Sequence, residues 1–235
     1  MQAYFVLFSF WYSLFPLFDD MIAVPDLDLV EFIETQILPR YADFDRAHNM
    51  EHVVRVIRRS LSLAASTGAD VNMVYTVAAY HDVGMSGPRA VHHITGGRIL
   101  SQDSRLLRWF SAEQIEVMRQ AIEDHRASAS RQPRSIYGRI VAEADRDIDV
   151  DVVIRRTVQY GLANYPELDR EQQWQRFREH MDNKYSVHGY IKLWLPNSPN
   201  QRSLNELRNL IADARRLREA FDHAYEVEKP DEKFG

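Results

Sequence analysis

Residues 78–84 have the sequence Ala-Ala-Tyr-His-Asp-Val-Gly and close an apolar run that begins near Val71. Valine and alanine recur in this run at helical spacing, and Gly84 is typical of a residue that ends a helix. Adjacent His81 and Asp82 at the end of a helix can both point at one metal ion. The stretch therefore predicts a buried helix that presents metal ligands at its end.

Helical periodicity extends over most of the chain, and strand signals are scarce. The expected helices cover residues 27–38, 50–66, 71–82, 92–100, 112–125, 136–147, 150–160, 171–185 and 204–227. We therefore expect an all-α protein, a helical bundle with a C-terminal helical extension. Its expected parts are an apolar N-terminal segment (1–24), a helical core (25–166), the extension (167–228) and a tail (229–235).

The composition restricts the partners of the protein. The 235 residues are 45% hydrophobic and 27% charged, as in ordinary soluble domains. A net charge of −5 disfavours a nucleic-acid polymer but leaves room for a small phosphorylated ligand in a local basic pocket. The absence of cysteine excludes disulfides and thiolate metal sites. We therefore expect a cytoplasmic protein with a small-molecule substrate.

Residues 3–18 are almost wholly apolar and aromatic. No basic residue precedes Arg40, so the positive region of a signal peptide is missing, and the segment, which contains Pro16, is short for a membrane helix of about 20 residues. Three interpretations stay open. The segment is an extension upstream of a true start at Met21, or it packs onto the domain, or it contacts a membrane, which we favour least.

Several histidines and carboxylates could meet in the core of the bundle. His48 and His52 are four residues apart and share one helix face, and His81 and Asp82 end another helix. Asp145 lies among apolar residues. Burying a carboxylate there costs folding free energy unless a cation or a hydrogen-bond donor compensates its charge. A histidine and carboxylate cluster suits a hydrolytic or oxygen-activating metal better than a structural zinc.

Two further histidines, His93 and His125, lie between the His81-Asp82 pair and Asp145 and are ligands of the same type. Asp147 competes with Asp145, although it would face another side of its helix. The arginines that follow His125 could bind phosphate oxygens, but each could equally lie on a solvated loop.

The ordered set resembles the HD-domain metal-dependent phosphohydrolase superfamily, whose signature is H…HD…D on a helical bundle. Three pieces of the chain carry the resemblance, namely Glu51-His52-Val53-Val54-Arg55-Val56, Ala78-Ala79-Tyr80-His81-Asp82-Val83-Gly84 and Glu143-Ala144-Asp145-Arg146. The resemblance covers residues 45–151. It implies an HD-domain bundle in which His52, His81, Asp82 and Asp145 hold one divalent metal ion.

Bimetallic members of that superfamily hold a second metal, and the resemblance then implies His93 and His125 as ligands, with Asp82 bridging both ions. His93 is preferred over His92 because the family's histidine precedes a run of small residues. The chain departs from the family after the HD pair, where a frequent lysine is absent. Another residue must then supply any phosphate contact that this lysine makes elsewhere.

The resemblance implies a hydrolase, a phosphatase or phosphodiesterase that cleaves a phosphate monoester or diester of a nucleotide or other small molecule. One or two ions of Mn, Fe, Co, Ni, Mg or Zn would activate the water, with Asp82 at the centre of the chemistry. His48 or Asp124 could protonate the leaving group. Arg126 and Arg134 are the substrate-binding candidates.

Two other functions stay open at this point. A di-iron oxygenase uses the same H…HD…H…H…D ligand set, and a non-catalytic nucleotide-binding domain would bind without turnover. The helix expected over residues 204–227 could pair with a copy of itself and form a homo-oligomer, although packing on its own domain is the favoured alternative.

Overall fold

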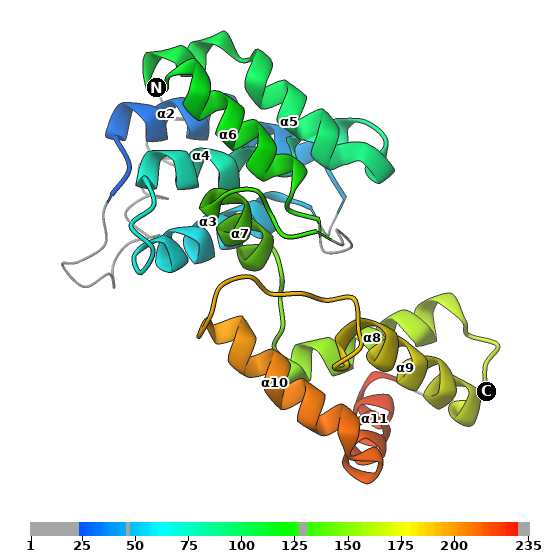
Figure 1. Ribbon diagram of the computed structural model, residues 1–235. Helices are drawn as coiled ribbons and strands as arrows, with labels where there is room; N and C mark the ends of the chain where they lie inside the picture. Colours follow the sequence, from blue (N-terminus) through cyan, green and yellow to red (C-terminus); the bar gives the residue numbers. More distant parts are fainter. Residues whose placement is uncertain (1–23, 46–47, 127–130, 230–235) are drawn as a thin grey trace. The chain divides into compact units, whose positions relative to one another are not determined.

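The computed structural model describes residues 24–45, 48–126 and 131–229. Within these ranges the chain forms ten α-helices and short 3-10 turns, with no strand, so the all-α prediction is confirmed (Figure 1). No helix in the same ranges has both the length and the apolar character needed to cross a membrane. The apolar stretch at residues 3–18 lies outside the described residues.

The chain divides into two compact units, residues 1–145 and 146–235. The predicted boundary after residue 166 differs from this division. Helix α8 (Val150–Asn164) belongs to the second unit because it packs against α9 (Arg170–Tyr185), α10 (Pro199–Ala212) and α11 (Ala214–Glu228). The first unit therefore ends at Asp145, at the last of the expected metal ligands.

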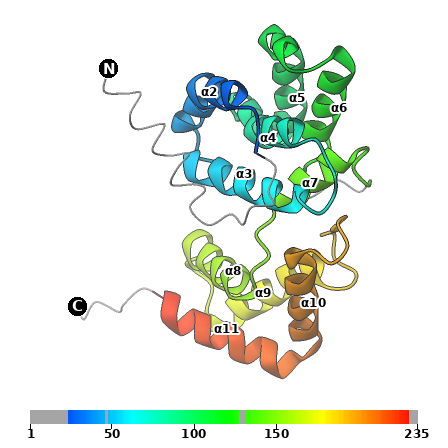
Figure 2. The ribbon, with the colours of Figure 1, turned by 90° about the vertical axis from the view of Figure 1, so that its left-hand side faces the viewer.

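Helix α4 (Val71–Tyr80) is the centre of the first unit. All its residues from Met73 to Tyr80 are buried, as expected of a helix that is apolar on every side. Figure 2 shows it surrounded by the other five helices of the unit. These are α2 (Leu27–Gln36), α3 (Met50–Ala64), α5 (His92–Gln102), α6 (Ala112–Glu123) and α7 (Ile136–Ala144).

Side-chain caps fix where the two central helices begin. The side-chain oxygen of Asn49 accepts the backbone N–H of His52 at 3.1 Å, and Asp70 accepts that of Met73 at 3.1 Å. Such caps satisfy backbone donors that have no partner within the helix. The Asn49 cap therefore places His52 in the first turn of α3.

The second unit has an aromatic core on α9 and α11. Trp174, Phe177 and Phe221 contact one another with ring centroids 5.2 to 5.9 Å apart. The single helix predicted over residues 204–227 is wrong, because the chain breaks at Asp213. This residue is extended, and its carboxylate accepts the N–H of Arg216 at 3.0 Å, which starts α11 as a new helix.

Candidate metal centre

Asp82 lies between two sets of side chains. The first set, called the first group, consists of His52, His81 and Asp145. Oδ2 of Asp82 is 3.1 Å from Nε2 of His81 and 3.4 Å from Nε2 of His52. Oδ1 of Asp145 is 3.2 Å from the same nitrogen of His52. Three segments of the chain, at the start of α3, the end of α4 and the end of α7, thus bring four potential ligand atoms together.

The second group consists of His92 and His125, on the other side of Asp82. Their Nε2 atoms are 3.4 and 3.6 Å from Oδ1 of Asp82 and 3.2 Å from each other. One carboxylate therefore offers one oxygen to each group. This is the arrangement of a bridging ligand. His52 and His81 with Asp82, and His92 and His125 with Asp82, each bring three ligand atoms close enough together to hold a metal ion.

The structure brings His92, and not the predicted His93, to the second group. The cause is the close approach of the backbone at Gly84 to the first turn of α5. If Gly84 carried a Cβ, that atom would overlap the carbonyl of His92 and lie 2.5 Å from the backbone nitrogen of Gly96. This contact presses the start of α5 against the turn that follows Asp82. His92 is then the residue that reaches the carboxylate.

His93 lies beside the group and does not join it. Its ring is 5.6 Å from that of His92, and among the described residues its buried Nδ1 has no hydrogen-bond partner. Burial, reinforced by the nearby Arg126 guanidinium, lowers the pKa of His93 to about 4. The side chain is therefore neutral at ordinary pH.

Three of the four imidazoles are held so that Nε2 faces the centre. Their Nδ1 atoms lie within hydrogen-bonding distance of the backbone carbonyl three residues earlier, for His81 at Ala78 (2.8 Å), for His92 at Arg89 (2.8 Å) and for His125 at Ile122 (2.6 Å). A carbonyl only accepts, so Nδ1 carries the proton and Nε2 keeps its lone pair. Metal-ligating histidines are usually oriented in this way, and these side chains fit a divalent cation.

His52 differs from the other three imidazoles. Its Nδ1 is 3.3 Å from Nη2 of Arg55, one turn further along α3. A guanidinium only donates, so this contact does not fix a proton on Nδ1 as the backbone carbonyls do for the other three rings.

The charges of the centre are strongly coupled. Burial raises the pKa of Asp82, but the imidazoles of His81, His125 and His52 outweigh it and hold the pKa well below its usual range. Asp145 is held at a pKa of about 2 for the same reasons. Burial lowers the pKa of His52, but its hydrogen bonds with the two carboxylates raise it to about 9. Without a metal, the proton of His52 thus offsets part of the negative charge of Asp82 and Asp145.

Asp145 was expected inside a helix, but it lies one residue beyond the end of that helix. Helix α7 ends at Ala144, and Asp145 caps it, with its backbone N–H still bonded to the carbonyl of Val141. Its competitor Asp147 belongs to the second unit, where it pairs with Arg156 at 3.5 Å. Asp145 is therefore the carboxylate of the first group.

Sequence reasoning missed Tyr41, which holds the HD pair in place. Its hydroxyl donates to the carbonyl of Ala79 at 2.9 Å and accepts the backbone N–H of Asp82 at 3.3 Å. Burial, together with the nearby carboxylate of Asp82, raises the pKa of this phenol far above its usual value, so it stays protonated. No local motif marks this residue, because its partners lie about 40 positions away.

His48 lies near the first group, with its ring 6.0 Å from that of His52. Its Nδ1 is 2.7 Å from Oδ1 of Asp45, and the other carboxylate oxygen of Asp45 is 3.5 Å from Arg89. The contact with Asp45 orients the imidazole and leaves Nε2 for another partner.

Asp124 and Arg134, predicted as a proton donor and a substrate-binding residue, bind each other. The carboxylate of Asp124 accepts from the backbone N–H of Arg134 at 2.8 Å and from its Nε at 2.9 Å, and Arg131 lies at 3.3 Å. Arg134 also pairs with Glu123 at 2.8 Å. These contacts hold the chain on either side of residues 127–130. The carboxylate of Asp124 is therefore engaged in contacts that hold this loop.

Arg126 stays near the second group. Its Nη1 donates to the carbonyl of Ala90 at 2.8 Å, just before the start of α5. The remaining donors of its guanidinium are available to a ligand at this edge of the centre.

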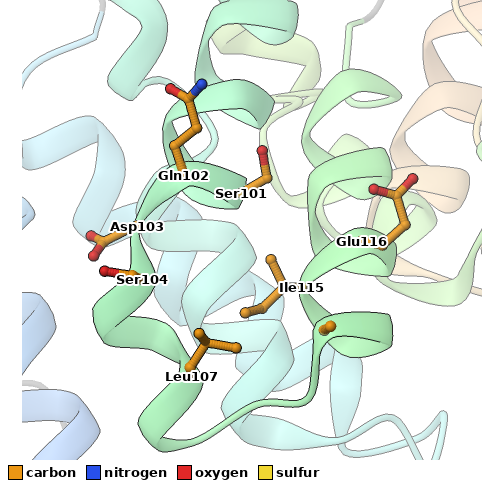
Figure 3. A pocket seen from close by; sticks show the side chains of 8 residues that line it. Ser101, Gln102, Asp103, Ser104, Leu107, Ile115 and Glu116 are labelled. Carbon is orange, nitrogen blue, oxygen red and sulfur yellow. The ribbon is translucent and has the colours of Figure 1, made fainter.

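A pocket of about 310 Å³ lies elsewhere in the first unit, between the end of α5 and the start of α6 (Figure 3). Its lining includes Leu107, Ile115 and Asp103, and Asp103 is already bound by Tyr80 and Arg105. His92 begins α5, so the pocket is about 15 Å from the centre at the rise of an α-helix. It is separate from the metal centre.

The cluster of imidazoles and carboxylates lies within a helical bundle and is compatible with a metal site. Residues 49–147 match the family model of the HD domain. All side chains of both groups, and Asp82 between them, lie within the matched residues. Comparisons with curated proteins and with solved structures gave no match.

Proposed function

We propose that the protein is a metal-dependent phosphohydrolase that cleaves a phosphate monoester or diester of a nucleotide or another small molecule. The HD domain indicates a superfamily made up mostly of metal-dependent hydrolases. One observation carries the proposal, namely the carboxylate of Asp82 shared between two groups of inward-facing imidazoles.

The side chains divide the work between two ligand sets. His52, His81 and Asp145 would hold one divalent cation, His92 and His125 a second, and Asp82 would contribute one oxygen to each. When bound, such cations lower the pKa of a coordinated water and draw charge from the phosphoryl oxygens. The carboxylates of Asp82, which is buried, and Asp145, which is half-buried, supply the negative charge that offsets the cations.

His48 is the proposed proton donor to the leaving group. Asp45 orients its ring, and its position beside His52 places it at the edge of the first group. Arg126 is the proposed contact to substrate phosphate, beside the second group. An imidazole suits proton donation, and a guanidinium suits the oxygens of a phosphate.

Metal analysis of protein purified without chelator, followed by a panel of phosphatase and phosphodiesterase substrates, tests the proposal. Manganese, cobalt, nickel or iron should support release of phosphate or cleavage of a diester, and Asp82→Ala should abolish it. Asp151→Asn, which changes an exposed carboxylate in the second unit, is the matched control. Full activity of the Asp82→Ala variant would rule the proposal out.

The same ligand set also fits a di-iron oxygenase, since four imidazoles and two carboxylates with one bridge suit a pair of irons. Metal identity distinguishes the two reactions. Turnover that consumes oxygen and requires iron favours the oxygenase, and turnover with redox-inert ions favours the hydrolase. Thermal stabilisation by nucleotides without any turnover would indicate a binding domain instead.

A further inference from the structure

Helix α9 of the second unit carries three basic side chains along one face. Arg176, His180 and Lys184 follow one another at intervals of four residues, a spacing that places them one above the other on a helix. The first and the last are about 12 Å apart along the axis at the rise of an α-helix. All three side chains are half-buried. They form a row of basic groups, called the basic row, set into the surface of the second unit.

No carboxylate pairs with the basic row among the residues that the structure describes. Arg176 donates to the backbone carbonyl of Thr157 at 2.6 Å and to the side-chain oxygen of Gln173 at 3.3 Å, and neither acceptor is charged. Nζ of Lys184 lies 5.1 Å from the ring centre of Tyr185 and has no hydrogen-bond partner within the described part of the chain. Both positive charges are therefore left without a counterion.

Other arginines of the second unit do have carboxylate partners. Arg170 and Arg218 each lie 3.0 Å from Asp222. Arg156 lies 3.5 Å from Asp147. A counterion is thus available to these arginines from the protein itself, whereas the basic row would have to obtain one from an anionic ligand.

His180, in the middle of the basic row, is affected by the two charges around it. Burial lowers its pKa to about 4, and the nearby charges of Lys184 and Arg176 reinforce the effect. The imidazole is therefore neutral at ordinary pH. Its ring nitrogens have no hydrogen-bond partner in the described ranges, and the nitrogen that carries the proton can donate to an anion.

Two exposed tyrosines lie beside the first residue of the basic row. Tyr160 on α8 and Tyr165, the residue after that helix, are 56% and 40% exposed. The guanidinium of Arg176 lies 5.9 Å from the ring centre of Tyr160 and 5.8 Å from that of Tyr165. Helices α8 and α9 pack against each other, which brings these residues together (Figure 1). Exposed aromatic rings beside basic side chains are the combination that holds a nucleobase and its phosphates.

We propose that this face of the second unit binds a nucleotide. The base lies against Tyr160 and Tyr165. The phosphates bind His180 and Lys184, and Arg176 lies between the two parts. A free nucleotide fits better than a nucleic-acid polymer, because the chain has a net charge of −5 and the basic row is only about 12 Å long. The inference goes beyond the proposed phosphohydrolase function, since the second unit alone supplies this site.

Calorimetry on the full chain tests the proposal, with ATP and inorganic triphosphate as the probes and a chelator present throughout. Lys184→Met should weaken ATP binding roughly ten- to hundredfold, the range for a lost hydrogen bond to a charged group. Lys184→Arg keeps the charge and should retain most of the affinity. Arg178→Met removes one charge from an exposed position of the same helix and should leave ATP binding unchanged.

Tyr160→Ala separates the contribution of the base from that of the phosphates. Loss of the ring should weaken ATP binding about five- to hundredfold, the range for base stacking on an aromatic side chain, and should leave triphosphate binding unchanged. Because Tyr160 is exposed, this variant should fold even where Lys184→Met does not. Circular dichroism and thermal unfolding monitor folding of each variant.

Three results would overturn the inference. The first is a wild-type protein that binds no ATP, or variants at Lys184 and Tyr160 that bind it as the wild type does. The second is triphosphate binding as tight as ATP binding with no effect of Tyr160→Ala, which would exclude a role for the base. The third is tighter binding of a short oligoadenylate than of ATP, which would indicate a polymer. Asp82→Ala should lose phosphohydrolase activity but still bind ATP in chelator, which separates the two proposals.

Discussion

The two groups around Asp82 are built from the same kinds of side chain but are unequal. The first group adds a second carboxylate, Asp145, to two imidazoles, whereas the second group has only imidazoles and the shared oxygen of Asp82. A further negative charge favours a divalent cation, so the first group should bind its ion more tightly. The second group depends on His92 at the very start of α5, and so on how closely that helix approaches the HD pair.

Removing Asp82 should produce the largest effect, because both groups lose their shared ligand. Asp82→Ala should reduce metal content at both positions and lower hydrolysis by about a thousandfold or more, since a bound metal supplies several kcal/mol of charge stabilisation. Metal analysis and steady-state kinetics give the two readouts. Loss of only one metal equivalent would contradict a bridging role.

Removing His92 should affect the second group alone. His92→Ala should weaken binding of the second metal equivalent by about a hundredfold or more, while the first equivalent binds normally. The loss should be at least as large as that caused by removing a side chain that only supports a metal ligand. His93→Ala is the matched control and should retain both equivalents. Titration with Mn²⁺ followed by electron paramagnetic resonance resolves the two. A larger effect from His93→Ala would restore the ligand expected from the sequence.

The next largest effect should be that of pH on metal binding at the first group. The pKa of His52 is raised to about 9 in the metal-free protein, so its proton stabilises the fold fully below pH 6.5, and this contribution is lost as the pH rises to about 9. A metal must displace that proton. Mn²⁺ affinity should therefore rise about tenfold per pH unit from about pH 7 to pH 9, whereas the thermal stability of the metal-free protein falls.

Calorimetry in buffers of different ionisation enthalpy measures the protons released on binding. Release of close to one proton at pH 7 agrees with a protonated His52. Affinity that is flat over this range would show that His52 does not bind the metal.

The sequence predicted the helices and the HD pair well because both depend on local patterns. Apolar spacing identified α4, and Asp145 stood out among apolar neighbours in the sequence. The sequence favoured His93, whereas the structure brings His92 to Asp82, because the outcome depends on a backbone contact between Gly84 and the start of α5 that only the packed structure shows.

The break at Asp213 had a local signal that was overridden. An aspartate followed by helix-forming residues is a typical N-cap, but the apolar stripe of residues 204–227 continues in register on both sides of it. Periodicity alone therefore joined two helices into one. Tyr41 had no such signal, since its role follows entirely from contacts with residues distant in the sequence.

Removing the hydroxyl of Tyr41 should have the smallest effect of these changes on metal binding. It tests how rigidly His81 and Asp82 must be held. Tyr41→Phe leaves the carbonyl of Ala79 and the N–H of Asp82 without their partner in a buried place, at a cost of about 1–3 kcal/mol in unfolding free energy. Tyr137→Phe removes a hydroxyl that accepts an exposed N–H of Asp70 and is the control with a smaller cost.

Because Asp82 serves both groups, a slight shift of its backbone should weaken both metal equivalents together, and by less than tenfold each. Denaturant unfolding and Mn²⁺ titration of the two variants measure this. If Tyr41→Phe weakens one equivalent only, the backbone of Asp82 is held by other contacts, and the inequality of the two groups comes from their own ligands alone.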